Sequence, residues 1–491
     1  MKLLILFFTY SFVIVQSQAQ PHSRPALEKT IDSIALHQQW QADIPGLAVA
    51  VLMNNELLYK KALGVENLAT GKKLTSLSDF HMASVSKPFA GTAILQLAER
   101  GKLQLDSSLV FYLPYFNMKD PRYKKITIYH LLTHSSGMAD VSDYQWDKPQ
   151  NDKDAAERYA KSFVDKELDF EPGSQFHYSN AAYNILAALI KHVSELSFED
   201  YLYKNILVPA GMNSSSFLFS DIESGRRTAS HIIDQDLQMA VSKSYPYNRI
   251  HAPSSTLHSD LEDMLQWTKL FLNKGKINGR QIISESTWKQ MLQPRFVVNE
   301  QYKVCFSWFE TIIGGRKIYF HSGGDLGYRT FVGFEPVEKI AIVLMGNNEL
   351  FDAAETGFSI FRSIILKVHA QTELKPIHLE LRKYVLKEGM EKLKQVYQEE
   401  KLKTPARYDT GAESILSLVS WLFDRNHREL TIEVLLWGAS QFPGDVSWYG
   451  HLGDVWTAWG EKSKAIGYYR QGLAIDPANK ELLQKIDTLE K

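Results

Sequence analysis

The stretch HMASVSKPFAG, residues 81–91, places a serine three positions before a lysine and a proline directly after that lysine. Proline has no backbone N–H to give to a helix and is tolerated mainly in the first turn. Because the residues that follow read as an apolar helix, the proline predicts a helix that begins within Ser84–Lys87. Ser84 and Lys87 then lie one turn apart on the same face. They are either a nucleophile with its base, or a helix cap and a solvated lysine.

Length and composition describe an ordinary globular protein. The chain has 491 residues, of which 44% are apolar, which is enough for two or three domains with packed cores. The 55 Lys and Arg residues nearly balance the 56 Asp and Glu residues, giving a net charge of −1. There is no basic field of the kind that holds nucleic acid, so no nucleic-acid partner is expected. The only cysteine, Cys305, excludes an intramolecular disulfide and is expected in the core.

The N-terminal residues have the pattern of a secretory signal. Lys2 precedes a short apolar run, and Ser17-Gln18-Ala19 fits a small-x-small cleavage site. The run is shorter than the ~20 residues that a spanning helix needs. We therefore predict a signal peptide over residues 1–19, a periplasmic or secreted location, and no membrane span in the mature chain. The alternative is a buried N-terminal helix or an uncleaved anchor.

Strand patterns lie at both ends of the first three quarters of the chain. Residues 46–67 read as two strands that turn at Asn54-Asn55, and strand patterns return between residues 316 and 346. The residues between look mainly helical. One sheet built from both ends with a helical lobe inserted between them is an α+β arrangement. We place this domain at residues 26–370 and a linker at 371–380.

The C-terminal region, residues 381–491, reads as helical throughout. A self-comparison at a spacing of 34 residues aligns Gly438 with Gly472 and Pro443 with Pro477. These offsets resemble a tetratricopeptide repeat, in which helix pairs stack on one another. The repeats are a candidate surface for a protein partner. The alternative is an irregular helical extension that stabilises or orients the rest of the chain.

Two further motifs follow the Ser84 motif. Tyr178-Ser179-Asn180 lies at the mouth of a predicted helix, and His321-Ser322-Gly323 lies at the end of a predicted strand. With their flanks ITIYHLLTHSSGM, EPGSQFHYSNAAY and FHSGGDLGY, these motifs give the chain a resemblance to the serine β-lactamase and penicillin-binding-protein superfamily. Similar groups are class C β-lactamases, D-alanyl-D-alanine carboxypeptidases, D-aminopeptidases and esterases. The resemblance covers most of residues 26–370.

The resemblance implies a β-lactamase/transpeptidase-like fold, with an antiparallel sheet from both chain ends, an inserted helical lobe and an all-α repeat region after it. A serine hydroxyl is a weak nucleophile until a base removes its proton. The family pattern implies that Ser84 is the nucleophile, and that Lys87 and Tyr178 accept its proton and return it to the leaving group. Asn180 is expected to bind Lys87 and the substrate amide. Alternatively, Tyr178 and Asn180 only pack and cap their helix.

The third motif is expected to bind the substrate. The oxyanion donors implied by the resemblance are the N–H groups of Ser84 and Gly324, and glycine at 323 and 324 lets a substrate strand approach closely. Class C β-lactamases usually have lysine where this chain has His321, whereas histidine resembles the carboxypeptidase, D-aminopeptidase and esterase branches. As an alternative, His321 is a structural strand residue. His134, in LLTHSSGM, is expected to brace a turn.

The sequence therefore predicts an exported serine hydrolase with a Ser84 acyl-enzyme. Its expected substrates contain amide or ester bonds: D-amino-acid peptides or small esters. One alternative is a class C-like β-lactamase, and another is an inactive peptidoglycan- or penicillin-binding receptor that uses its C-terminal repeats as a scaffold. The sequence contains no HExxH, Walker loop, GxGxxG or zinc-spaced Cys/His set, so no metal or cofactor is expected.

Overall fold

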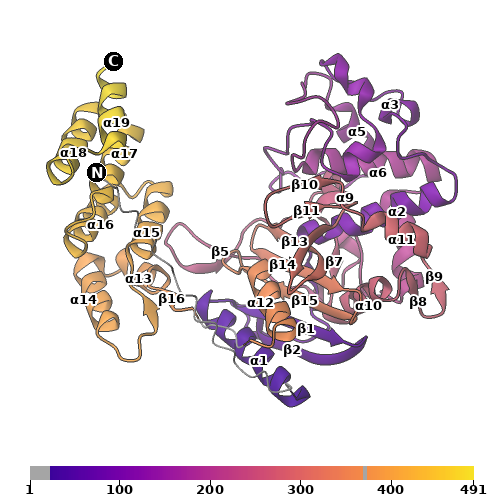
Figure 1. The fold of residues 1–491 in the computed structure, drawn as a ribbon, viewed down its shortest axis with the longest axis horizontal. Helices are drawn as coiled ribbons and strands as arrows, with labels where there is room; N and C mark the ends of the chain where they lie inside the picture. The colour runs from indigo at the N-terminus through magenta and orange to yellow at the C-terminus, as the bar shows by residue number, and fades with distance from the viewer. Residues whose placement is uncertain (1–22, 369–372) are drawn as a thin grey trace, which may run out of the picture.

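An antiparallel sheet organises the fold of the computed structural model, which describes residues 23–368 and 373–491 (Figure 1). The predicted signal peptide lies outside the described residues. The sheet has nine strands in the order β10-β11-β12-β13-β14-β15-β1-β2-β3. Their bounds in that order are Phe296–Val297, Lys303–Val304, Phe309–Ile313, Arg316–Asp325, Tyr328–Glu335, Ile340–Gly346, Gly46–Met53, Glu56–Asn67 and Lys72–Lys73. The predicted turn at Asn54-Asn55 and the pairing of N-terminal with C-terminal strands are confirmed.

Strand β1 shows why the sheet is central. Its sequence, GLAVAVLM, is apolar throughout, and its residues are buried as far as Leu52. Successive side chains point to opposite faces of a sheet, so Ala48 and Ala50 belong to one core and Leu47 and Val49 to the other. A strand with two apolar faces must be covered on both sides. Helices α1 (Arg24–Gln41) and α12 (Ala353–Ile365) supply apolar residues to the second core.

The helical lobe contributes most of the other core. Its main helices are α2 (Ser86–Glu99), α5 (Ala155–Lys161), α6 (Asn180–Ser194), α10 (Leu261–Leu272) and α11 (Glu285–Met291), with short α3 (Leu109–Tyr112), α4 (Ile128–Leu132), α7 (Phe198–Leu202), α8 (Val208–Ala210) and α9 (Ala252–Ser255) between them. Leu186 and Leu189 of α6 and Trp267 of α10 are fully buried in this core. Figure 1 shows the lobe on the side of the sheet away from α1 and α12.

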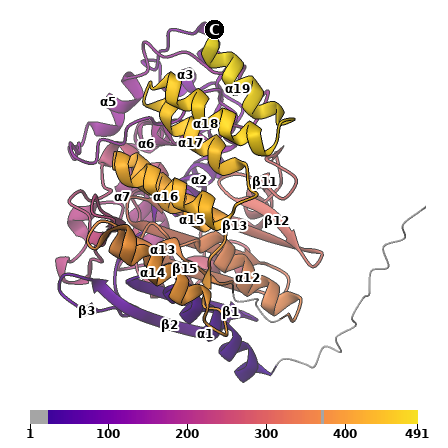
Figure 2. The ribbon, with the colours of Figure 1, turned by 90° about the vertical axis from the view of Figure 1, so that its left-hand side faces the viewer.

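The C-terminal residues form a stack of helices (Figure 2) that stands apart from the first domain in Figure 1. The helices are α13 (His378–Val385), α14 (Gly389–Lys401), α15 (Ala412–Asp424), α16 (Arg428–Gln441), α17 (Ser447–Ala458), α18 (Lys462–Ile475) and α19 (Lys480–Glu490). A side chain at Gly453 would lie 2.1 Å from the Tyr469 ring, so glycine there lets α17 and α18 approach closely. The assignment to tetratricopeptide repeats stays a prediction.

The region after the first domain differs in one respect from an all-helical segment. Residues 373–380, predicted as a linker, include strand β16 (Lys375–Pro376), which pairs in parallel with β17 (Tyr408–Asp409). Neither two-residue strand is long enough to produce a periodic sequence pattern. Both positions are set by contacts with distant residues, which sequence patterning does not report.

Charged side chains and a hairpin join the helical stack to the first domain. Lys375 donates to the Asp43 carboxylate and the Trp40 carbonyl, and the Arg382 guanidinium lies 3.0 Å from the same carboxylate. The side chains of Lys375 and Arg382 are 2% and 3% exposed. The hairpin of β5 (His231–Ile233) and β6 (Met239–Val241) reaches across to the stack, as Figure 1 shows. Its Leu237 is buried among residues of the helical stack, and its carbonyl accepts from Arg382.

Removing the Asp43 carboxylate is expected to destabilise this junction. Asp43→Ala leaves two buried cations without a counter-ion, which costs about 3 kcal/mol when one partner of a buried pair is removed. Urea unfolding followed by tryptophan fluorescence measures the change. The control is Glu28→Ala, which breaks the exposed pair with Arg24 and is expected to cost less than about 0.5 kcal/mol. Equal unfolding midpoints for the two variants would contradict the assignment.

Candidate active site

Ser84 lies in a constrained turn at the start of helix α2. A short 3-10 helix, Ala83–Val85, leads directly into α2, which begins at Ser86. Pro88 is therefore in the first turn, and the predicted position of the helix start is confirmed. Ala83 has φ of +48°, a conformation that residues with a side chain rarely adopt. The Met82 carbonyl accepts from Thr330 Oγ1 at 2.8 Å, so the neighbouring strand β14 holds this turn in place.

The Lys87 amine is the centre of the site. Its Nζ lies 2.8 Å from Ser84 Oγ, 2.6 Å from Asn180 Oδ1 and 2.9 Å from the Ser254 carbonyl oxygen. The side chain is fully buried. These contacts bring together α2, α6 and α9, three segments that are distant in the sequence.

Burial lowers the pKa of Lys87 to about 7, because removal from water disfavours the ammonium form. The carboxylates of Asp325 and Asp140 act in the opposite direction and favour the cation. The net effect gives a large fraction of neutral amine at neutral pH. A neutral amine 2.8 Å from the Ser84 hydroxyl can accept its proton.

Tyr178 approaches the same hydroxyl from the loop before α6. Its phenol oxygen lies 3.0 Å from Ser84 Oγ. The ring stacks on His134 with 4.2 Å between ring centroids. Burial raises the pKa of Tyr178 well above its usual range, so the neutral phenol is the resting form. Tyr178 is thus placed to donate a hydrogen bond, while Lys87 is the group whose pKa suits a base.

Asn180 contacts Lys87 as predicted, but its amide group is already occupied on the other side. Its Nδ2 donates to Asp140 Oδ2 at 3.1 Å and to the Tyr144 hydroxyl at 2.8 Å, which uses both hydrogens. The Asn180 backbone N–H donates to Asp140 Oδ1 at 2.6 Å. For the predicted bond from Asn180 to a substrate amide, the contact with Asp140 or Tyr144 must first open.

His321 faces the site from strand β13 and is neutral. Its side chain is 2% exposed, and Nδ1 lies 2.7 Å from the Ser322 carbonyl oxygen. Nδ1 therefore carries the proton and donates it to this carbonyl oxygen. Nε2 is an acceptor with no partner among the described residues. Burial, together with the charge of Lys87, lowers the pKa of His321 to about 3. His321 thus supplies no fixed positive charge at neutral pH.

The packing around the two predicted glycines, Gly323 and Gly324, differs. A side chain at Gly323 would lie 2.4 Å from the Met82 carbonyl oxygen and 2.4 Å from Thr330 Oγ1, so only glycine lets β13 pack against the Ser84 turn. A side chain at Gly324 would lie 3.4 Å from Arg329 Cδ, just at the limit of ordinary contact. Packing against neighbouring residues therefore requires glycine at 323 and not at 324.

One edge of β13 beside these glycines is open to a substrate. Strand β12 pairs with β13 only as far as Phe320, whereas β14 pairs with the opposite edge through to Asp325. The first N–H groups of a helix have no partner within it, and Ser84 lies at the start of one. Gly323, the neighbour of Gly324, lies against Met82 and Ala83 of the Ser84 turn. The pairing of the Ser84 and Gly324 N–H groups as oxyanion donors stays a prediction.

Sequence reasoning missed Asp325, which ties three parts of the site together. Its Oδ2 lies 2.7 Å from His81 Nε2 and also accepts from the Ser255 hydroxyl. His81 directly precedes the Ser84 turn, and Ser255 follows the carbonyl that accepts from Lys87. In the sequence, only its position directly after Gly323-Gly324 could have pointed to Asp325. The other missed partners, Asp140, Tyr144 and Ser254, lie outside the three motifs.

His134 and Cys305 have the structural positions expected of them. His134 has φ of +54° in its turn, and its Nδ1 accepts from the Ser179 N–H at 3.0 Å, so bracing of the turn is confirmed. Cys305 is fully buried, and burial raises the pKa of its thiol to about 12. Within residues 23–368 and 373–491, no group of three His, Cys, Asp or Glu side chains could hold a metal ion. No helix in those ranges is long and apolar enough to cross a bilayer.

Relatives of known sequence share part of their length with this chain. Protein flp of Staphylococcus aureus (strain MRSA252) is 26% identical over 325 residues, which are 65% of this chain and 63% of that protein. The chain thus spans less than two thirds of that relative. Penicillin-binding protein 4 of Amycolatopsis lactamdurans is 26% identical over 276 residues, 52% of this chain and 70% of that protein.

Two solved structures have a similar fold. The octameric penicillin-binding protein homologue from Pyrococcus abyssi superposes with a TM-score of 0.62 at 22% identity, covering 73% of this chain and 81% of that one. The penicillin-binding protein from Bacillus halodurans gives a TM-score of 0.58 at 22% identity, covering 68% and 98%. They confirm the predicted fold of the sheet and helical lobe.

The family follows from the match to a family model. The model described as Beta-lactamase matches residues 31–360, which is more than half of the chain. This range includes the Ser84, Tyr178 and His321 motifs. The C-terminal helices lie outside it. The chain therefore belongs to the beta-lactamase family, which with the penicillin-binding proteins consists generally of serine hydrolases.

Proposed function

We propose that this protein hydrolyses amide or ester bonds through a covalent acyl-enzyme on Ser84. The observation that carries the proposal is the convergence of Lys87 Nζ at 2.8 Å and Tyr178 Oη at 3.0 Å on Ser84 Oγ. A hydroxyl that only caps a helix does not need a buried amine and a buried phenol beside it. A binding-only receptor likewise has no use for a lysine whose pKa is held at about 7.

Acylation begins with proton transfer from Ser84 to the neutral Lys87 amine. Ser84 Oγ attacks the substrate carbonyl carbon, and the carbonyl electron pair moves onto oxygen. The N–H groups of Ser84 and Gly324 stabilise that oxyanion. When the tetrahedral intermediate collapses, the bond to the leaving group breaks, and the leaving group takes a proton from the Tyr178 phenol. The Lys87 ammonium then returns a proton to the Tyr178 phenolate, which leaves both groups neutral, and the acyl group stays on Ser84.

Deacylation uses the same groups with water in place of the leaving group. Neutral Lys87, with Tyr178 beside it, accepts a proton from water as the water oxygen attacks the acyl carbon. The bond to Ser84 Oγ breaks, and Ser84 recovers its proton from the protonated base. Amide and ester substrates share this path, since both present a carbonyl with a leaving group that needs a proton.

Charge at the site favours substrates without a carboxylate beside the cleaved bond. His321 is neutral, so the position occupied by lysine in class C β-lactamases offers no cation for a substrate carboxylate. The carboxylates of Asp140 and Asp325 are near enough to favour the charged form of Lys87, so negative charge lies beside the base. We propose D-amino-acid amides, D-aminopeptides and small esters as the substrate class, in preference to β-lactams and C-terminal D,D-peptides.

Acyl-enzyme formation gives the first test. Incubation with a fluorophosphonate, a penicillin or a nitrophenyl ester is expected to add one adduct, which peptide mass spectrometry places on Ser84. The Ser84→Ala variant is expected to form none, because it lacks the nucleophile. An adduct on another residue, or no adduct and no turnover with any acyl substrate, would contradict the proposal and favour a binding role.

The pH dependence tests the role of Lys87. Its pKa of about 7 means that the amine becomes neutral as pH rises through 7, so kcat/KM for a nitrophenyl ester is expected to rise with a midpoint near pH 7. Lys87→Met keeps much of the volume and removes the base, which is expected to lower kcat/KM by about 100-fold or more. A midpoint below 5 or above 9, or an active Lys87→Met, would exclude Lys87 as the base.

A pair of substrates tests the charge argument. An N-acyl-D-Ala-D-Ala peptide has a carboxylate beside the cleaved bond, whereas D-alanine p-nitroanilide has none. Like charges placed together cost several kcal/mol, so kcat/KM is expected to be about tenfold or more higher for D-alanine p-nitroanilide. The measurement is steady-state hydrolysis of both at pH 8. Faster release of D-alanine from the acylated peptide would reverse the assigned substrate class while leaving the Ser84 chemistry in place.

A further inference from the structure

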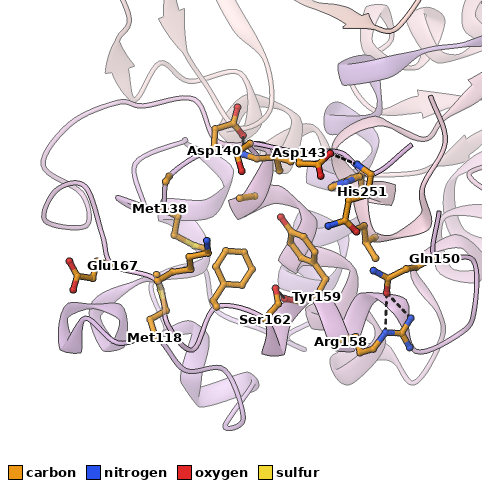
Figure 3. A pocket seen from close by; sticks show the side chains of 18 residues that line it. Met118, Met138, Asp140, Asp143, Gln150, Arg158, Tyr159, Ser162, Glu167 and His251 are labelled. Carbon is orange, nitrogen blue, oxygen red and sulfur yellow. Dashed lines mark hydrogen bonds between the residues drawn. The ribbon is translucent and has the colours of Figure 1, made fainter. Parts of the chain in front are cut away.

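A cavity of about 380 Å³ lies in the helical lobe (Figure 3). Its walls come from the loop at residues 138–145, from helix α5 and the residues after it, and from Ile250 and His251. None of the residues that pass protons to or from Ser84 lines it. A cavity of this size is within the range that holds small ligands or substrate side chains.

Three of its lining residues are attached directly to the active site. Asp140 lines the cavity and accepts from the Asn180 backbone N–H and Nδ2. Ala181, another lining residue, follows Asn180 in α6. His251 lines the cavity three residues before Ser254, whose carbonyl accepts from Lys87. Two of these segments, those of Ala181 and His251, therefore each carry a wall of the cavity and a partner of the catalytic amine, and the third contacts that amine's partner Asn180 through Asp140.

The interior is mainly apolar. Met118 and Met138 are 4% and 1% exposed, and Phe163 and Ile250 are also buried. Thioether side chains are unbranched and polarisable, so they adapt to occupants of different shape. Figure 3 shows these methionines on one side of the space with Tyr159 on the other. Such a lining favours an aromatic or branched apolar group.

Two of the charged groups that line the cavity, Arg158 and Asp140, already have partners within the protein. Arg158 donates to Gln150 through Nε and Nη2 at 3.0 and 2.9 Å, as Figure 3 shows, and forms an ion pair with Asp152. The Asp140 carboxylate accepts from Asn180. Neither charge needs a ligand as its partner. These two groups therefore do not indicate a charged occupant.

The geometry of the tetrahedral intermediate assigns which part of a substrate faces this cavity. Its carbon carries four groups: Ser84 Oγ, the oxyanion, the leaving group and the acyl substituent. The oxyanion faces the Ser84 and Gly324 N–H groups, and the leaving group faces its proton donor, Tyr178. The acyl substituent is left with the remaining side, where Asn180 and the 138–145 loop lie.

We propose that this cavity binds the acyl side chain of the substrate, and that the protein prefers amides and esters whose acyl part carries an aromatic or branched apolar group. This inference rests on the proposed Ser84 chemistry and adds the identity of the acyl group to it. Asp140 stands at the boundary between the cavity and Asn180. Its contact with Asn180 opens when the acyl group enters.

The ratio of kcat/KM for p-nitrophenyl phenylacetate to that for p-nitrophenyl acetate tests this inference. Wild type is expected to prefer phenylacetate. Ser162→Trp places a bulky ring on the cavity wall and is expected to lower the ratio about tenfold or more, since a single methylene in an apolar pocket is worth 10-fold or more. The matched control is Ser286→Trp, at an exposed serine of α11 that does not line the cavity.

A second variant acts in the opposite direction. Met118→Ala enlarges the cavity and is expected to shift the preference toward bulkier acyl groups, such as p-nitrophenyl 4-phenylbutanoate. It keeps the test decisive if Ser162→Trp does not fold. Ratios equal to wild type in each cavity variant that folds, or a wild-type preference for acetate, would overturn the acyl pocket. Absence of any Ser84 adduct in wild type would instead overturn the proposed hydrolase.

Discussion

The burial of one amine sets the conditions for everything else at this site. Lys87 has no exposed surface, and the nitrogen is held by a serine hydroxyl, an amide oxygen and a backbone carbonyl. A lysine in water is almost wholly protonated at neutral pH and cannot accept a proton. Removal from water brings its pKa to about 7, against the opposing effect of two carboxylates. The packing of the helical lobe around α2 is therefore part of the chemistry, because a looser lobe would admit water and restore the cation.

The sheet supplies the second constraint, which is the close approach of β13 to the Ser84 turn. Gly323 leaves no room for a side chain between β13 and the Met82 carbonyl. Asp325 then fixes the end of the strand to His81 and to the segment after Ser254. The nucleophile, the base and the open strand edge thus come from parts of the chain that only the completed sheet brings together. The junction with the C-terminal helices, built on Asp43 and the β5–β6 hairpin, adds a further set of contacts to this frame.

Local features could be predicted from the sequence, whereas features set by distant contacts could not. Pro88 placed the start of α2, and the continuous apolar run of residues 46–53 placed a strand, because both effects act within a few residues. The occupied amide of Asn180 could not be predicted, since it depends on where the 138–145 loop folds. Asp325 looked like an ordinary residue after a glycine pair, and strands β16 and β17 are too short to have a period. The apolar cavity is likewise assembled from several distant segments, none of which has a distinctive pattern by itself.

The central claim is that Lys87 loses its proton near pH 7 in the folded protein, so that a large fraction of the amine is neutral there. Its direct test is a titration of the protein labelled with 13C at lysine Cε, in which the Lys87 signal is assigned by its absence from Lys87→Met. The account predicts that this one signal titrates with a midpoint near pH 7, while the exposed lysines titrate near their usual pKa of about 10.4. A Lys87 signal that titrates together with the exposed lysines would contradict the account, because the amine would then be a cation with no capacity to activate Ser84.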